Sequence, residues 1–120
     1  MPHRRLAGRL ILLVEDEPVI ALDVEKALRE AGARVVTAGY LESGLYTTVH
    51  PDLSAAVVDL HLGDGSGTMI CRELQRLGVP FLIHTGYPHM LTAGEWPGTT
   101  VISKPAPTEQ IVSTLAGMLD

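Results

Sequence analysis

Charged and hydroxyl side chains stand at the ends of apolar runs at four points of the chain. These residues are Glu15 with Asp16, Asp59, Thr85 and Lys104. Two carboxylates about 4.5 Å apart repel one another by roughly 3–4 kcal/mol at an effective dielectric near 20, so a group of three acids needs a cation. Oxygen ligands without a histidine and cysteine cluster favour Mg²⁺ over zinc. Because Mg²⁺ is often completed by a phosphate oxygen, these residue types indicate phosphoryl chemistry.

Each of these residues, taken alone, also has a purely structural explanation. Asp16 ahead of Pro18 is typical of a helix cap. Asp59 is also explained as a solvated loop residue, Thr85 as a small strand-end residue and Lys104 as a surface lysine. These separate explanations do not predict that the side chains lie together, whereas a functional site does.

Short apolar runs alternate with helical periodicities along the chain. Runs without polar alternation are typical of strands buried on both faces. Strands are predicted at 10–14, 34–38, 55–58, 81–85 and 101–103. Helices are predicted from Pro18 to Gly32, around Leu41, Leu45 and Val49, from Ile70 to Gly78, and from about Thr108. This alternation implies an α/β fold with right-handed crossovers and a parallel sheet covered on both faces. The strand ends then meet at the edge where such sheets bind ligands.

Composition limits the classes of function. The chain has 120 residues, 46% of them hydrophobic, which suits one domain with a proper core. A net charge of −5 argues against nucleic acid as a direct partner. A single cysteine, Cys71, excludes a disulfide framework and suits a reducing compartment. No run approaches the ~20 apolar residues that span a bilayer, so a soluble, cytoplasmic domain without a membrane partner is expected.

Four motifs carry a resemblance to a known family. VEDEP at 14–18, VVDLHLGDGSG at 57–67, the threonine of HTG at 84–86 and SKP at 103–105 resemble the receiver domain of bacterial two-component response regulators. The resemblance covers nearly the whole chain, with the motifs in order on the expected elements. It implies a flavodoxin-like, doubly wound (βα)5 fold with sheet order 2-1-3-4-5. It also implies a receiver domain over 1–120. Because the last predicted helix ends the chain, no effector domain is expected in it, and it is either a complete single-domain regulator or a receiver cut from a longer chain.

The resemblance also assigns roles to the strand-end residues. Asp59 corresponds to the phosphoacceptor, a carboxylate nucleophile. Glu15 and Asp16 correspond to the acidic pair that holds Mg²⁺ together with Asp59. Thr85 corresponds to the switch hydroxyl and Lys104 to the lysine that binds the phosphoryl group. The only activities implied are Mg²⁺-dependent self-phosphorylation from phosphohistidine and autodephosphorylation.

Three further residues are expected to lie around the site, by the resemblance or by their position; the alternative for the side chains of His61 and Tyr87 is that both point to solvent and matter little. The backbone carbonyl of His61 is expected to contact the metal. The side chains of His61 and Tyr87 are expected to modulate the lifetime of the phosphoryl group, because each lies two residues beyond a site residue. The bond between Lys104 and Pro105 is expected to be cis, which proline makes affordable.

The sequence departs from the commonest receiver pattern near the fourth and fifth strands. Val101 stands where an aromatic residue is usual. PFLIHTGYP at 80–88 resembles a subgroup of single-domain receivers with a Phe…Thr-Gly-Tyr motif, associated with a class of histidine kinases in alphaproteobacteria. Between 86 and 100, where receivers place their fourth helix, Pro88, Gly94 and Pro97 predict a short or irregular helix.

Other classes of protein fit less well. A phosphatase of the haloacid-dehalogenase type needs a second acid at position 61, which is His61, and an EF-hand needs oxygen ligands at His61 and Gly63. The glycines at 63–67 lack the spacing of a dinucleotide-binding loop. The remaining alternative is a non-phosphorylated pseudo-receiver that acts as a protein-binding module. The expected partners are a sensor histidine kinase or a histidine phosphotransfer protein, and an unknown downstream protein.

Overall fold

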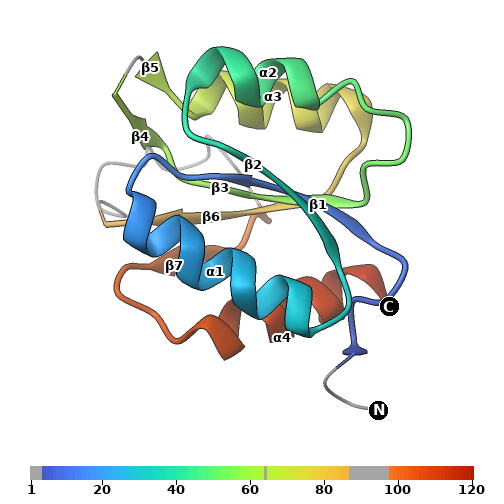
Figure 1. The fold of residues 1–120 in the computed structure, drawn as a ribbon. Helices are drawn as coiled ribbons and strands as arrows, with labels where there is room; N and C mark the ends of the chain where they lie inside the picture. The colour runs from blue at the N-terminus through green and yellow to red at the C-terminus, as the bar shows by residue number, and fades with distance from the viewer. Residues whose placement is uncertain (1–3, 64, 87–97) are drawn as a thin grey trace.

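Five parallel strands form the central sheet of the computed structural model, which describes residues 4–63, 65–86 and 98–120. Their order in the sheet is β2-β1-β3-β6-β7 (Figure 1). The strands are β1 (Leu10–Val14), β2 (Arg34–Ala38), β3 (Ala55–Val58), β6 (Phe81–Thr85) and β7 (Val101–Ser103). Since β6 and β7 are the fourth and fifth strands of this sheet along the chain, the order confirms the predicted 2-1-3-4-5 arrangement.

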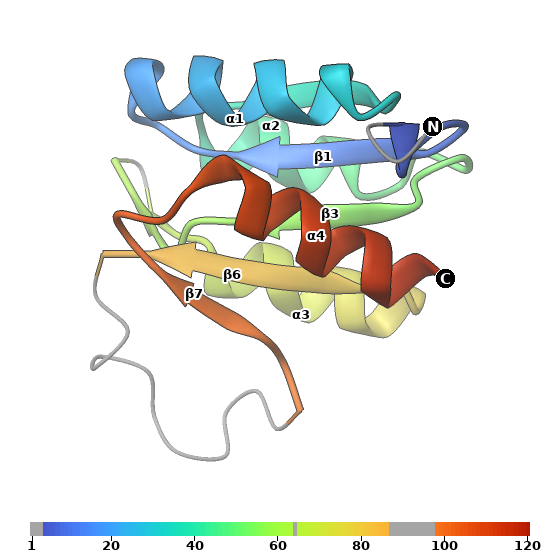
Figure 2. The same cartoon turned by 90° about the horizontal axis from the view of Figure 1, so that it is seen from below.

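Helices cover both faces of the sheet (Figures 1 and 2). Helices α1 (Pro18–Glu30) and α4 (Thr108–Leu119) lie on one face. Helices α2 (Leu41–Thr47) and α3 (Thr68–Leu77) lie on the other. The α/β fold expected from the alternating periodicities is therefore confirmed.

The strands are apolar throughout because successive side chains enter different cores. On β1, Leu13 packs into the core beneath α1 and α4, whereas Leu12 packs into the core beneath α2 and α3. On β6, Leu82 and Ile83 divide in the same way. Burial on both faces thus explains why the sequence shows continuous apolar runs instead of polar alternation.

Two details differ from the sequence-based expectations. Helix α2 ends at Thr47, and Val49 is 65% exposed instead of lying inward. The hydroxyl of Thr48 donates to the carbonyl of Leu45 at 2.7 Å, and this kind of local bond competes with continuation of a helix. A small antiparallel hairpin, β4 (His61–Leu62) and β5 (Gly65–Ser66), follows β3 and was not predicted.

The expectation of a short or irregular helix at 86–100 falls mainly on residues 87–97, which lie outside the described residues. It therefore stays a prediction. The flanking strands are described: β6 ends at Thr85, and β7 begins at Val101.

The basic N-terminal segment packs against the domain. Leu6 is fully buried in the core beneath α1 and α4, and its N–H donates to the carbonyl of Ala31 at 2.8 Å. The guanidinium of Arg9 donates to the carbonyl of Leu119 at the end of α4, also at 2.8 Å. Residues 4–9 therefore join the ends of α1 and α4.

Candidate functional site

The sheet register brings the ends of β1, β3 and β6 to one edge. Val14 pairs with Val58, and Val58 pairs with Ile83. The N–H of Asp59 donates to the carbonyl of Val14 at 3.0 Å, so Asp59 continues the ladder one residue beyond β3. This is the carboxyl edge of the sheet, where α/β proteins bind their ligands.

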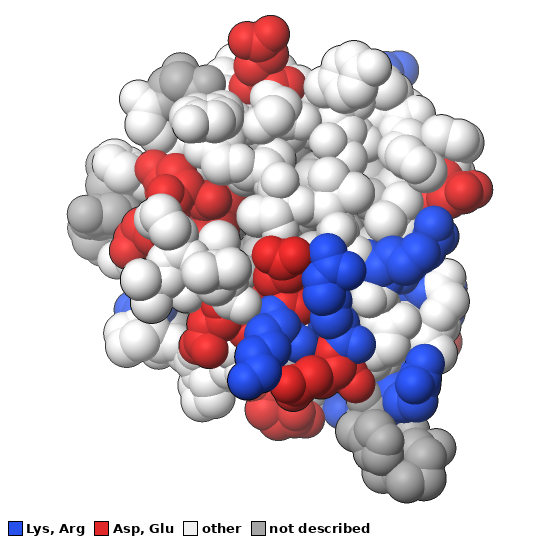
Figure 3. All heavy atoms as spheres, in the orientation of Figure 1, with Lys and Arg blue, Asp and Glu red and all other residues white. Residues whose placement is uncertain are grey.

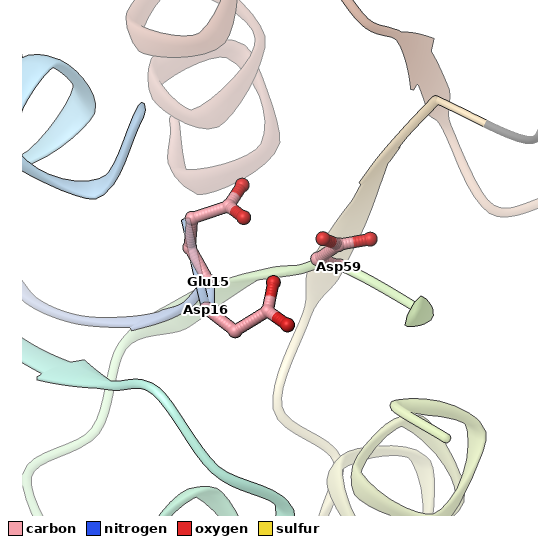
Figure 4. Close-up of side chains that lie close together, drawn as sticks. All are labelled: Glu15, Asp16 and Asp59. Carbon is pink, nitrogen blue, oxygen red and sulfur yellow. The ribbon is translucent and has the colours of Figure 1, made fainter. Parts of the chain in front are cut away.

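Three carboxylates meet at this edge (Figure 4). One oxygen from each of Glu15, Asp16 and Asp59 lies within 4.8 Å of the others. Glu15 and Asp59 are each only 3% exposed, whereas Asp16 is exposed. A group of carboxylate oxygens at this spacing suits a hard divalent cation such as Mg²⁺. The convergence expected from the sequence is thus present in the structure.

Lys104 lies between two of these carboxylates. Its Nζ is 2.7 Å from Oε1 of Glu15 and 2.9 Å from Oδ2 of Asp59. A third carboxylate, that of Glu17, lies 3.8 Å away. The side chain of Lys104 is only 11% exposed, so it is a part of the buried cluster and not a surface lysine.

Burial and charge shift the ionisation of this cluster in opposite senses. Burial raises the pKa of the Glu15 carboxyl above its usual value, although the hydrogen bond and charge of Lys104 oppose this rise. Burial alone would lower the pKa of Lys104, but its bonds to Glu15 and Asp59 outweigh that effect and raise it. The lysine therefore stays charged, and it offsets part of the repulsion between the two buried acids.

Backbone donors orient the two buried carboxylates. Oδ1 of Asp59 accepts a hydrogen bond from the N–H of His61 at 3.1 Å. Oε2 of Glu15 accepts one from the N–H of Glu17 at 3.2 Å. The remaining oxygens, Oδ2 and Oε1, face Lys104. Each carboxylate is thus held with one oxygen toward the shared centre.

A glycine allows the chain to pass close to Asp59. A Cβ on Gly67 would lie 2.2 Å from the backbone oxygen of Asp59, far inside van der Waals contact. The N–H of Gly67 donates to the carbonyl of Leu60 at 3.0 Å, which closes the loop ahead of α3. Any side chain at this position would therefore displace the backbone that carries Asp59.

The other residues singled out in the sequence lie around this centre. Thr85 is 1% exposed at the end of β6, and its carbonyl accepts a hydrogen bond from the N–H of Lys104 at 2.9 Å. The peptide bond from Lys104 to Pro105 is cis, as the resemblance implied. The side chain of His61 is exposed. Tyr87 lies outside the described residues.

The structure adds one residue that the motif analysis did not single out. His84, on β6, is 4% exposed, and its Nε2 has no hydrogen-bond partner in the described part of the chain. Burial and the charge of Lys104 lower its pKa to about 4, while Asp59 acts in the opposite sense. A signal was available in the sequence, since a histidine directly before Thr85 interrupts an apolar run.

A cleft of about 610 Å³ opens beside the cluster. Asp59, His84 and Lys104 line it, together with Asp16 and Glu17 at the start of α1. In Figure 3 acidic side chains gather on the left of the molecule, the side on which Figure 1 places the ends of the parallel strands. A ligand that enters this cleft therefore meets an acidic rim and a buried ammonium group.

The fold and this site define a class of protein, and comparison with known proteins agrees. Residues 11–116 match the family of the response regulator receiver domain. The chain therefore belongs to the receiver-domain family of response regulators.

The curated relatives that the chain matches are longer proteins. The probable transcriptional regulatory protein TcrX of Mycobacterium tuberculosis is 32% identical over 97% of this chain and 53% of its own length. The sensor protein TorS of Escherichia coli K12 is 31% identical over 96% of this chain and 13% of its own length. The chain thus spans about half of one relative and a small part of the other.

Solved structures show the same fold. The PhyR response regulator receiver domain of Erythrobacter litoralis superposes with a TM-score of 0.83 at 25% identity, covering 94% of this chain and 91% of its own. The response regulator PhyR of Brucella abortus gives 0.82 at 27% identity, covering 97% of this chain and 49% of its own. Within the described residues, no helix is long and apolar enough to cross a membrane.

Proposed function

We propose that this chain is a phosphoacceptor of a two-component signalling system, with Asp59 as the residue that receives the phosphoryl group. The observation that supports this most is the arrangement around Asp59. Its carboxylate is buried, grouped with Glu15 and Asp16, and 2.9 Å from the ammonium of Lys104. A nucleophilic carboxylate beside a cation site and a fixed positive charge is suited to phosphoryl transfer.

In the proposed reaction, an oxygen of Asp59 attacks the phosphorus of a phosphohistidine. The P–N bond breaks, the donor imidazole leaves with its electron pair and takes up a proton, and an acyl phosphate forms on Asp59. The His61 N–H fixes one oxygen of Asp59 at 3.1 Å, which leaves the other to react. The ammonium of Lys104 then binds an oxygen of the transferred group as a point charge.

The residues at the site fit Mg²⁺, with Glu15, Asp16, Asp59 and the backbone carbonyl of His61 as its proposed protein ligands. A bound Mg²⁺ would offset the charge that the phosphoryl group and the three carboxylates bring together. Asp16, the exposed member of the group, faces solvent where a hydrated cation enters. Glu15 reaches the same centre from the buried side.

The proposed output is a change in a protein-interaction surface. Thr85 and Lys104 lie on adjacent strand ends, joined by a backbone hydrogen bond of 2.9 Å. Movement of either side chain toward a phosphoryl group would therefore pull on both β6 and the loop before α4. The side chains of His61 and Tyr87 are proposed to tune hydrolysis of the acyl phosphate.

The proposed partners are a sensor histidine kinase or a histidine phosphotransfer protein upstream and a protein target downstream. The proposed location is the cytoplasm of a bacterium, where such relays operate. The Phe…Thr-Gly-Tyr likeness supports assignment to the single-domain subgroup. These assignments rest on the family and on the sequence motifs.

Intact mass measurement tests the proposal against a pseudo-receiver that only binds partners. The protein is incubated with acetyl phosphate in the presence of Mg²⁺ and, in parallel, of excess chelator. We expect a gain of about 80 Da, the mass of one phosphoryl group, only with Mg²⁺. An unchanged mass under both conditions would favour the binding module.

A further inference from the structure

His84 carries an unused hydrogen-bonding atom within the proposed site. Its side chain is almost fully buried, and Nε2 has no partner among the described residues. Buried polar atoms are nearly always paired in folded proteins, so an unpaired one calls for an explanation. His84 lines the same cleft as Asp59 and Lys104, so we expect the explanation in this group of side chains.

The sheet register places His84 on the strand between those that lead to Asp59 and to Lys104. Because Val58 pairs with Ile83, the next residues along, Asp59 and His84, are neighbours across the sheet. On its other side His84 pairs with Ile102, and Lys104 follows two residues later on the same face. Nζ of Lys104 lies 2.9 Å from Asp59, and its charge acts on the imidazole of His84, so the ammonium lies near this histidine.

The state of the imidazole defines what it can bind. The side chain of His84 is only 4% exposed, and burial disfavours the charged form of an imidazole, so the neutral form is the one to consider. A neutral imidazole has one nitrogen that donates and one that accepts. With the proton on Nδ1, the unpaired Nε2 is an acceptor that lacks a donor.

The ammonium group of Lys104, in turn, has a donor without a close acceptor among the described residues. An ammonium group has three donors. Two of them meet Glu15 and Asp59 at 2.7 and 2.9 Å, while among the described residues the third has only Glu17 at 3.8 Å, beyond hydrogen-bond distance. A cation that binds Glu15 would take away one of the two good acceptors. A mostly buried ammonium then needs a replacement.

We propose that His84 is a positioning residue for Lys104, whose ammonium donates to Nε2 of His84 when Glu15 turns to a bound divalent cation. This inference rests on the proposed function, because it uses the same Mg²⁺ site. His84 would favour metal binding by offering Lys104 a second acceptor. It would also keep the ammonium close to Asp59, where a phosphoryl group arrives.

Mg²⁺ affinity, measured by calorimetry, tests the inference. His84→Leu removes the acceptor, so we expect Mg²⁺ to bind about fivefold more weakly than to the wild type. His84→Gln keeps an acceptor oxygen and should stay within about twofold of the wild type. The matched control is Ile102→Leu. Ile102 pairs with His84 on the neighbouring strand, and neither isoleucine nor leucine has a side-chain atom that forms hydrogen bonds.

Thermal stability without metal separates this role from a structural one. His84→Leu removes a buried polar atom that has no partner among the described residues, so its melting temperature should equal or exceed that of the wild type. A loss of packing would lower the melting temperature together with the Mg²⁺ affinity. Weaker Mg²⁺ binding at an unchanged or higher melting temperature therefore indicates the proposed role. Equal Mg²⁺ affinity of His84→Leu and the wild type would overturn the inference.

Nitrogen NMR of the wild-type imidazole gives a reading that does not depend on a variant. We expect the Nε2 signal of His84 to shift as Mg²⁺ saturates the site, since the nitrogen gains a donor. A signal that does not move at saturation would overturn the inference, even if His84→Leu fails to fold. A wild type that binds no Mg²⁺ would overturn the metal site itself, whereas a wild type that binds it and gains phosphate leaves the proposed function standing.

Discussion

Nζ of Lys104 lies 2.9 Å from Oδ2 of Asp59, although the two residues are 45 positions apart in the chain. The same nitrogen lies 2.7 Å from Glu15. The lysine thus holds the charge-balancing position between two buried carboxylates. A divalent cation that uses these carboxylates must therefore compete with Lys104.

Replacing Lys104 with methionine should have opposite effects on stability and on metal binding. Without metal, the two buried acids lose their partner, and we expect the free energy of unfolding to fall by about 3 kcal/mol. Mg²⁺ should bind more tightly than in the wild type, because the competing ammonium is gone. Calorimetry and urea unfolding measure the two quantities. Lys26→Met, at an exposed lysine of α1, is the control, and weaker Mg²⁺ binding in Lys104→Met would contradict the competition.

Asp16→Asn should weaken Mg²⁺ binding while leaving the fold intact. The side chain of Asp16 is exposed, so loss of its charge leaves no buried group unpaired. Phosphorylation by acetyl phosphate should slow in parallel with the loss of metal affinity. Asp23→Asn changes an acid that lines the same cleft but lies outside the carboxylate group. If both variants bind Mg²⁺ like the wild type, Asp16 is only a residue at the start of a helix.

Gly67→Ala should damage the site through the backbone. The new Cβ would lie 2.2 Å from the carbonyl oxygen of Asp59, so the loop must move. We expect a loss of roughly 2–4 kcal/mol in the free energy of unfolding and slower phosphorylation. Gly117→Ala, on the exposed side of α4, meets no atom within 4 Å and should stabilise the protein by about 0.5–1 kcal/mol. Similar stability of the two variants would contradict the close approach at Gly67.

Acid should destabilise the protein through His84. Its pKa is about 4 in the folded protein, against an ordinary value of 6.5, so between these values the unfolded chain binds a proton that the folded protein does not. Stability should therefore fall as the pH drops through this window, by up to about 3 kcal/mol from this residue.

The variant His84→Gln isolates the contribution of this histidine. Glu15 acts in the opposite sense, since its raised pKa lets the folded protein take up a proton first. Both proteins keep Glu15, so the difference between their unfolding free energies reports His84. The wild type should lose more stability than His84→Gln between pH 6.5 and about 4. Parallel curves would show that His84 titrates normally.

The sequence was sufficient to predict the sheet and the carboxylate group for a physical reason. In a parallel α/β fold the strand ends share an edge, so locating five apolar runs also locates the residues that follow them. Glu15, Asp16 and Asp59 meet as expected because each directly follows a strand. The positions of these residues depend on the backbone, which periodicity predicts well.

Side-chain partners were harder to predict, because they depend on distances across the sheet. Taken alone, Lys104 resembles a surface lysine, yet it is buried between Glu15 and Asp59. The burial of Leu6 was missed because the segment before β1 has no periodicity. In the sequence motif His84 is only the residue before Thr85. That its Nε2 has no partner among the described residues becomes visible only in the folded structure.

Location of the phosphoryl group by peptide mass analysis tests the central claim most directly. Wild type and Asp59→Asn are treated with acetyl phosphate and Mg²⁺, digested at acidic pH and compared. The wild type should gain about 80 Da on the peptide that contains Asp59, and the variant, which keeps the shape but lacks the nucleophile, should gain none. Equal labelling of the variant, or a phosphoryl group on another residue of the wild type, would contradict the account.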